Sequence, residues 1–141
     1  MKKKRRLIVV KEHQFIACGD FGSVYRISKD KVVKVFDCGD SKEILENLAT
    51  DELRGSKLIK HALPVLERVN VLCLDGKIRP GLIKEYLPYD INYQEFYRFI
   101  KKNNIKTWDA KAINYRKDSK GKIWRVDTQT QDIWRIIDRV N

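Results

Sequence analysis

Residues 17–36 read ACGDFGSVYRISKDKVVKVF, and this stretch decides the fold. It contains two short apolar, β-branched runs, residues 23–27 and 32–36, with a polar turn between them. Such a pattern predicts a β-hairpin. The second run contains a lysine, Lys34, at its centre. A lysine on the solvent face of the strand is one explanation; a buried ammonium with an anionic partner is the other.

A helix follows the hairpin, and further strands flank both. Asp40 or Ser41 can cap the helix, and Glu43 stands three residues after Asp40 as in a capping box. Its apolar face carries a carboxylate, Glu52, which requires a cation on the surface that it packs against. The other residues of that face are Leu45, Leu48 and Ile59; further strands are predicted at 7–10, 14–17, 69–74 and 82–87, with turns at 75–76 and 79–81.

The chain beyond Pro88 predicts a smaller and mostly helical part. The spacing of Tyr93, Phe96, Tyr97 and Ile100 is that of an amphipathic helix. A strand at 123–126 and a final helix over 133–140 complete the pattern. A β-rich part with one helix, a break near residue 88 and a helical part predict an α+β fold with two lobes.

Composition and charge restrict the class of protein. Of 141 residues, 43% are hydrophobic, which is enough for one core and excludes wholesale disorder. No apolar run approaches the ~20 residues of a membrane helix, and residues 7–10 are too short for a signal-peptide core. We therefore expect a cytoplasmic protein, with delivery into a host cell or nuclear targeting through the basic run at 2–6 as alternatives. The net charge of +11 favours anionic partners.

Three features of the first part indicate a phosphate site when they are taken together. Gly19 and Gly22 lie between two predicted strands, where glycine lets backbone N–H groups approach a phosphate. Lys34, on the next strand, can reach the same phosphate. An ion pair between Lys34 and Glu52 would explain both misplaced charges. Each feature alone is more typical of an ordinary turn, an exposed strand face or a helix surface.

The second part contains the residue types that phosphoryl transfer needs. Asp109 can orient or deprotonate an acceptor hydroxyl, and Lys111 can neutralise the transferring phosphate. Asn114 and Asp127 offer the hard oxygen ligands that Mg²⁺ prefers. A polar loop in a charged protein has a similar composition, so the order of these residues carries the argument.

That order, with its spacing and predicted elements, resembles the signature of the protein kinases. Gly19, Gly22 and Val24 resemble the Gly-rich loop (17–24), Lys34 the strand lysine and Glu52 its helix partner. The hinge corresponds to residues 85–87, the catalytic loop to 109–114 and the metal-binding aspartate to Asp127; the resemblance spans residues 12–128.

The resemblance implies a bilobal protein-kinase-like fold. Residues 1–87, with a basic arm at 1–6, would form a β-rich N-lobe with one helix, and residues 88–141 a much reduced helical C-lobe. It also implies ATP and Mg²⁺ as cofactors. The ATP contacts that it implies are Gly19, Phe21, Gly22, Val24, Lys34, Glu85 and Leu87; the catalytic residues are Asp109, Lys111, Lys34 and Glu52, and the metal ligands Asn114 and Asp127.

Several positions depart from the kinase pattern. Ala17 replaces the first loop glycine, and Thr107-Trp108 replaces the His-Arg before the catalytic aspartate. Thr128 and Gln129 stand where the D-F-G motif has Phe and Gly, and Lys84 stands where an apolar residue is usual. Because few residues of this sequence follow Asp127, we expect no peptide-docking lobe. The pattern resembles the minimal kinases of bacterial effectors and phages, some of which need an activating partner.

Three functions remain open from the sequence. The first is a minimal Ser/Thr-type protein kinase, activated by a partner protein or active alone on a protein substrate. The second is a pseudokinase that acts as a scaffold for a partner, with or without nucleotide. The third is a binder of nucleic acid or another anionic surface, suggested by the net charge and the run Lys2–Arg6 but not by any recognisable motif.

Overall fold

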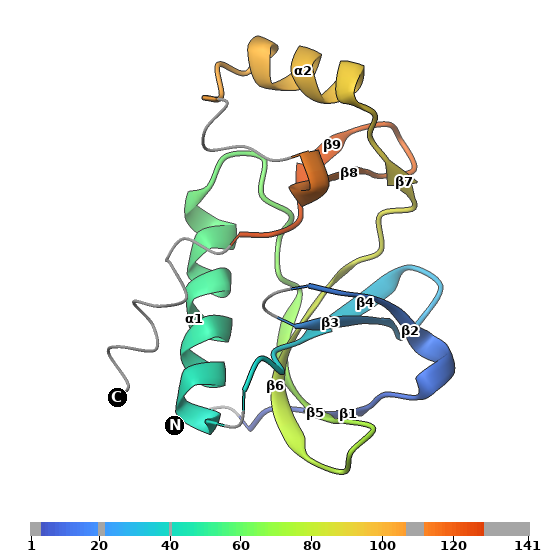
Figure 1. The fold of residues 1–141 in the computed structure, drawn as a ribbon, viewed down its shortest axis with the longest axis vertical. Helices are drawn as coiled ribbons and strands as arrows, with labels where there is room; N and C mark the ends of the chain where they lie inside the picture. The colour runs from blue at the N-terminus through green and yellow to red at the C-terminus, as the bar shows by residue number, and fades with distance from the viewer. Residues whose placement is uncertain (1–3, 20–21, 40, 107–111, 129–141) are drawn as a thin grey trace.

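The computed structural model describes residues 4–19, 22–39, 41–106 and 112–128. A six-stranded sheet with one long helix forms the larger part, and a three-stranded sheet with a second helix lies beyond one end of it (Figure 1). The α+β class is therefore confirmed. The predicted strand at 123–126 is present as β9 (Ile123–Arg125), and the described residues beyond Pro88 contain two further strands beside one α-helix. The final helix expected at 133–140 lies outside the described residues.

The larger sheet follows the order β1-β5-β6-β4-β3-β2. Neighbouring strands are antiparallel except for β1, which runs parallel to β5. The predicted hairpin is the β3–β4 pair, in which Val24 lies opposite Lys34. The strands are β1 (Leu7–Val9), β2 (Phe15–Cys18), β3 (Ser23–Arg26), β4 (Lys31–Val35), β5 (Glu67–Leu72) and β6 (Ile78–Glu85), and a short 3-10 helix, η1 (Glu12–Gln14), joins the first two.

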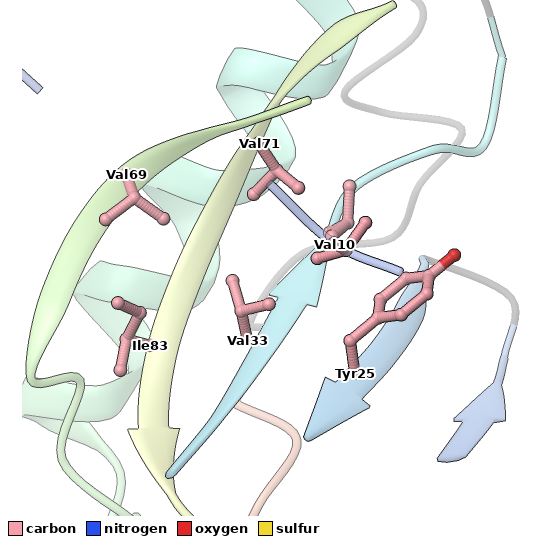
Figure 2. Packing of buried hydrophobic residues seen from close by; sticks show 7 residues of the cluster. Val10, Tyr25, Val33, Val69, Val71 and Ile83 are labelled. Atoms are coloured by element: carbon pink, nitrogen blue, oxygen red, sulfur yellow. The ribbon is translucent and has the colours of Figure 1, made fainter. Parts of the chain in front are cut away.

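One face of this sheet forms the first hydrophobic core. Figure 2 shows the side chains of Val33 on β4 and Ile83 on β6 on the same side as Tyr25 of β3. Burying a side chain of this size completely stabilises the fold by roughly 1.5–3 kcal/mol. The cluster consists of Val10, Tyr25, Val33, Val35, Val69, Val71 and Ile83.

The predicted turn at residues 79–81 is wrong, because these residues belong to β6. Gly81 is needed there for close packing, since a Cβ on it would lie 2.7 Å from a methyl group of Val71. The partner of Pro80 on β5, Asn70, donates its N–H to Arg6 instead, whereas Pro80 accepts the Phe36 N–H on its other side. In an antiparallel pair the two residues exchange both hydrogen bonds or neither, so the missing N–H of Pro80 breaks no bond to β5.

Helix α1 (Lys42–Leu58) covers the opposite face of the sheet (Figure 1). Its cap is Ser41, whose side chain accepts a hydrogen bond from the Ile44 N–H, while Asp40 is outside the described residues. The predicted buried face is correct for Leu45, Leu48 and Glu52; Ile59 is half-buried at the C-cap. The apolar contacts of this layer are Phe36, Leu45, Leu48, Ala49 and Leu82.

The smaller part contains α2 (Tyr93–Lys102) and the sheet β7-β8-β9. Only half of the predicted apolar stripe of α2 is buried: Phe96 and Ile100 pack with Tyr115, whereas Tyr93 and Tyr97 are exposed. Neither described helix has the length and hydropathy to cross a membrane. The strands are β7 (Tyr89–Asp90), β8 (Tyr115–Lys117) and β9 (Ile123–Arg125), and η3 (Ala112–Asn114) is a 3-10 helix before β8.

Backbone hydrogen bonds attach β9 to the chain that follows α1. The Leu63 N–H donates to the Arg125 carbonyl, and the Arg125 N–H donates to the His61 carbonyl. His61 has a positive φ of 63°, which turns the chain after the helix. This attachment places the residues that follow β9 beside the buried face of α1.

Part of the N-terminal basic run is used to hold the fold together. Arg5 donates two hydrogen bonds of 2.8 Å to the carboxylate of Glu46 on α1. Arg68 of β5 binds the same carboxylate at 2.6 Å. Arg6 pairs with Glu67 at 2.8 Å. These contacts account for two of the charges that a solvated basic arm would otherwise present.

The Glu46 contacts predict a dependence of stability on acid pH. Burial opposes ionisation of Glu46, but the hydrogen bonds from Arg5 and Arg68 outweigh it and lower the pKa of Glu46 below its ordinary value of 4.5. The stabilisation is therefore present above that value and lost as the pH falls through the lower, folded-state pKa. Glu46→Gln should lower the urea midpoint at neutral pH, and its difference from wild type should shrink between about pH 5 and 3. A constant difference over that range would contradict this reading.

Candidate functional site

The predicted ion pair between Lys34 and Glu52 is present and buried. The Lys34 Nζ lies 2.5 Å from Oε1 of Glu52. The Glu52 side chain is fully buried and that of Lys34 is 15% exposed. Lys34 therefore lies on the face of β4 that packs against α1, and its interpretation as a solvent-facing lysine is wrong.

A second anion, Asp127, lies close enough to influence Lys34. Burial opposes the charged form of the Lys34 ammonium. The charges of Glu52 and Asp127, together with the hydrogen bond to Glu52, outweigh burial and raise the pKa of Lys34 above its ordinary value. The charges of two carboxylates from distant parts of the sequence thus keep the lysine in its charged form.

Lys84 of β6 is a second cation against the same carboxylate. Its side chain is 5% exposed, and its Nζ lies 3.1 Å from Oε2 of Glu52. This contact lacks hydrogen-bond geometry, because Oε2 accepts no hydrogen bond among the described residues. The Lys84 ammonium donates instead to the carbonyl of Val126, at 2.8 Å. Lys84 therefore joins α1 to the chain after β9.

Thr128 gives that chain a second attachment. Its side chain is fully buried, and its Oγ1 donates to the backbone carbonyl of Glu52 at 2.8 Å. Val126 and Thr128, the two neighbours of Asp127, are thus both bound to the framework that carries Lys34 and Glu52. Asp127 itself is half-buried.

The structure also brings Asn114 next to this segment. The Val126 N–H donates to the Asn114 carbonyl at 2.7 Å. Asn114 ends η3 and is half-buried. The two residues predicted to bind Mg²⁺ therefore belong to backbone segments in direct contact. Asp109, Lys111 and Phe21, which were also predicted to belong to the site, lie outside the described residues.

The glycines of the predicted phosphate loop have different surroundings. Gly22 is buried, and a Cβ on it would lie 2.0 Å from the Val35 carbonyl oxygen. Gly19 has open space around it, and its N–H donates to the Gly22 carbonyl at 2.8 Å. Gly22 is therefore required for the approach of the loop to β4, whatever the loop binds. Val24, half-buried on β3, shares the face of Lys34 because the two residues are opposite each other.

Alanine substitutions at Gly22 and Gly19 should differ in their effect on stability, because only Gly22 is packed against a neighbouring strand. Gly22→Ala is expected to destabilise the protein by about 1–3 kcal/mol, because its methyl group has to displace the backbone of β4. Gly19→Ala should change the free energy of unfolding by less than ~0.5 kcal/mol. Urea unfolding of both variants measures the difference. Equal effects would mean that the loop does not pack on Val35.

The predicted hinge connects the two parts of the molecule. Glu85 is exposed at the end of β6, whereas Leu87 is buried. The Tyr86 N–H donates to the Asp30 carbonyl, and the Leu87 carbonyl accepts from Nε of Arg116 at 2.9 Å. Two backbone groups of the predicted hinge are thus used within the protein.

Two concavities of the described surface lie away from this cluster. One is lined by Gly39, Lys42, Leu45 and residues 77–80, and another by residues 13–16 and 26–29. Neither includes Lys34, Asp127 or the other charged residues around Glu52. The candidate site is therefore defined by the charged residues around Glu52 and their contacts.

Sequence reasoning assigned no role to two members of the cluster, Lys84 and Thr128. Lys84 stands in an apolar strand as Lys34 does, and this was the signal that could have found it. Thr128 carried no such signal, because a threonine after a strand is ordinary.

A comparison of this chain with protein-family models found no match, and neither did a search of curated proteins.

Proposed function

We propose that this protein binds ATP with Mg²⁺ and transfers phosphate to a hydroxyl group, in the manner of a minimal Ser/Thr-type protein kinase. The observation that carries the proposal is the position of Lys34. It pairs with Glu52 at 2.5 Å and is influenced by the charge of Asp127. Kinases need a strand lysine paired with a helix glutamate, and a metal-binding aspartate beside them.

The arrangement of the surrounding elements supports the same proposal. A loop with two glycines joins β2 to β3, the lysine lies on the next strand, and the glutamate lies on the helix after it. This is the order in which a kinase N-lobe presents its nucleotide site. The bilobal kinase-like fold, with residues 88–141 as a reduced second lobe, is part of the proposal.

The residues present fit a magnesium ion bound with nucleotide phosphates. Asp127 and Asn114 offer a carboxylate and an amide oxygen, and their segments are joined by the bond from Val126 to Asn114. Mg²⁺ is usually bound through one or two carboxylates plus substrate phosphates, so a small set of protein ligands suffices. When bound, Mg²⁺ would neutralise charge that develops on the phosphates.

Each residue has a defined part in the proposed reaction. Lys34, held by Glu52, binds the phosphate oxygens and keeps the nucleotide in one position. Asp109 accepts the proton of the acceptor hydroxyl while the oxygen of that hydroxyl bonds to the γ-phosphorus. The bond from the γ-phosphorus to the bridging oxygen breaks, and ADP departs with its electrons. Lys111 balances charge on the transferred group. The acceptor is proposed to be a protein Ser or Thr, reached directly or through an activating partner.

Calorimetry of ATP binding, with and without Mg²⁺, tests the proposal. Wild type should bind ATP more tightly with Mg²⁺, and Lys34→Met should weaken binding at least ~10-fold, since one charge-assisted hydrogen bond to phosphate is worth roughly 1.5–3 kcal/mol. Lys29→Met, in the exposed turn of the same hairpin, is the control and should bind like wild type. Absence of binding to wild type under both conditions would overturn the proposal.

A scaffold function is a second candidate, and the hinge is the observation that favours it. Because the Tyr86 N–H and the Leu87 carbonyl already have partners, fewer backbone groups remain for adenine. A scaffold would bind a partner protein with equal affinity in wild type and Lys34→Met. Failure of ATP binding together with such a complex would establish this alternative.

A further inference from the structure

The residues around Glu52 assign a role to Lys84 that the kinase signature does not contain. We infer that Lys84 is a positioning residue: with Thr128, it fixes the segment that carries Asp127 against α1 and β6. The anchoring stands on the contacts alone, whereas its use in positioning a metal ligand rests on the proposed function.

Lys84 is buried, and its ammonium group therefore needs compensating partners. Removing an ammonium from water is expensive, so a buried lysine occurs where its partners compensate. Lys84 is 5% exposed and has two partners, the Glu52 carboxylate at 3.1 Å and the Val126 carbonyl at 2.8 Å. Glu52 already has a cation in Lys34, so charge balance on Glu52 alone does not require Lys84. The contact that only Lys84 makes is the one to Val126.

The two bonds that attach this segment, at Val126 and Thr128, lie on either side of Asp127. Val126 is bound by Lys84, and Thr128 is bound to the Glu52 carbonyl at 2.8 Å. The anchored residues are the immediate neighbours of Asp127 on each side. Fixing both neighbours restricts the backbone dihedrals around Asp127 and therefore where its carboxylate can lie. One of these bonds comes from a side chain of β6 and the other goes to the backbone of α1, so the segment is held by two separate elements.

The charges around the anchor are balanced as a group. Two ammonium groups, those of Lys34 and Lys84, lie against the Glu52 carboxylate, and the charge of Asp127 also acts on Lys34. A methionine at position 84 could fill the space of the lysine, but it would leave the Val126 carbonyl without its donor. The segment should then separate from β6 while the hydrophobic clusters remain intact.

Amide hydrogen exchange of the nucleotide-free protein tests the anchoring directly. In Lys84→Met, the amides of residues 126–128 should exchange at least ~10-fold faster, which corresponds to about 1.4 kcal/mol of lost local stability. Amides of β4 and β5 should stay within about twofold of wild type, and Lys29→Met should change neither group. Unchanged exchange at 126–128 would overturn the inference, as would equal acceleration throughout the sheet.

A second pair of variants keeps the test decisive if Lys84→Met does not fold. Thr128→Val removes the bond to the Glu52 carbonyl without changing any charge, and it should accelerate exchange at 126–128 in the same way. Lys84→Arg retains a cation and a donor, so it should preserve more protection than Lys84→Met. No local effect in Thr128→Val would overturn the two-sided anchor.

ATP titrations of the same variants separate this inference from the proposed function. Lys84→Met should lose affinity mainly in the presence of Mg²⁺, because it acts through Asp127. In an Asp127→Asn background the same substitution should have little further effect, since the two changes remove one interaction. Additive effects would overturn the positioning role. Faster exchange at 126–128 in a protein whose wild type binds no ATP would support the anchor and refute the proposed function.

Discussion

Glu52→Gln is expected to lower the free energy of unfolding by about 3–5 kcal/mol, the range found when one partner of a buried ion pair is removed. The neutral amide leaves two ammonium groups, those of Lys34 and Lys84, around a side chain that is fully buried. Their mutual repulsion is no longer compensated, and little water can enter to solvate them. Because glutamine has nearly the shape of glutamate, the loss of stability measures the effect of the charge and not of packing.

Urea unfolding at neutral pH measures this loss against two other variants. Glu43→Gln lies on the exposed side of the same helix and should change stability by less than ~0.5 kcal/mol. Lys34→Met should be less damaging than Glu52→Gln, because Lys84 remains 3.1 Å from the carboxylate. If Glu52→Gln proved as mild as Glu43→Gln, the buried charges would contribute nothing to the fold.

Asp127→Asn is expected to reduce phosphate transfer by roughly 1000-fold or more, since metal neutralisation of transition-state charge is worth several kcal/mol. The amide keeps the size of the side chain but removes the negative charge that attracts a cation. Mg²⁺ should then no longer strengthen ATP binding. Transfer of labelled γ-phosphate, both to the chain itself and to a library of Ser- and Thr-containing peptides, measures the effect.

Two further variants test whether a loss of phosphate transfer comes from the assigned residues. Asp109→Asn removes the proposed base and should lower transfer by about 10²–10⁴-fold while ATP still binds. Asp30→Asn, in the exposed turn of the β3–β4 hairpin, is the matched control and should retain full activity. Phosphate transfer that survives both Asp109→Asn and Asp127→Asn would show that the assigned roles are wrong.

The sequence predicted the structure best at charged residues that stand within apolar stretches. A lysine in an apolar strand and a glutamate in an apolar helix face each needed a partner, and Lys34 and Glu52 are partners. The β3–β4 hairpin was predictable because its pattern is local. Lys84 gave the same signal as Lys34, but its main partner is a backbone carbonyl, and a carbonyl has no signature in a sequence.

The errors in the smaller part have a similar cause. β7 is only Tyr89–Asp90, too short to show a period, and it exists because it pairs with β8. Tyr93 and Tyr97 kept helical spacing but lie beyond the reach of the small sheet, so they remain exposed. Spacing predicts which residues share a face; how much of that face is covered depends on elements elsewhere in the chain.

The bonds that hold residues 126–128 also set an order of events during synthesis. The Val126 carbonyl lies 42 positions after its donor Lys84, and Thr128 lies 76 positions after Glu52. The six strands and α1 are complete by Glu85, so they are synthesised before the Val126 carbonyl that accepts from Lys84. Residues 126–128 therefore make their attachments to Lys84 and Glu52 only after the larger part of the fold has been synthesised.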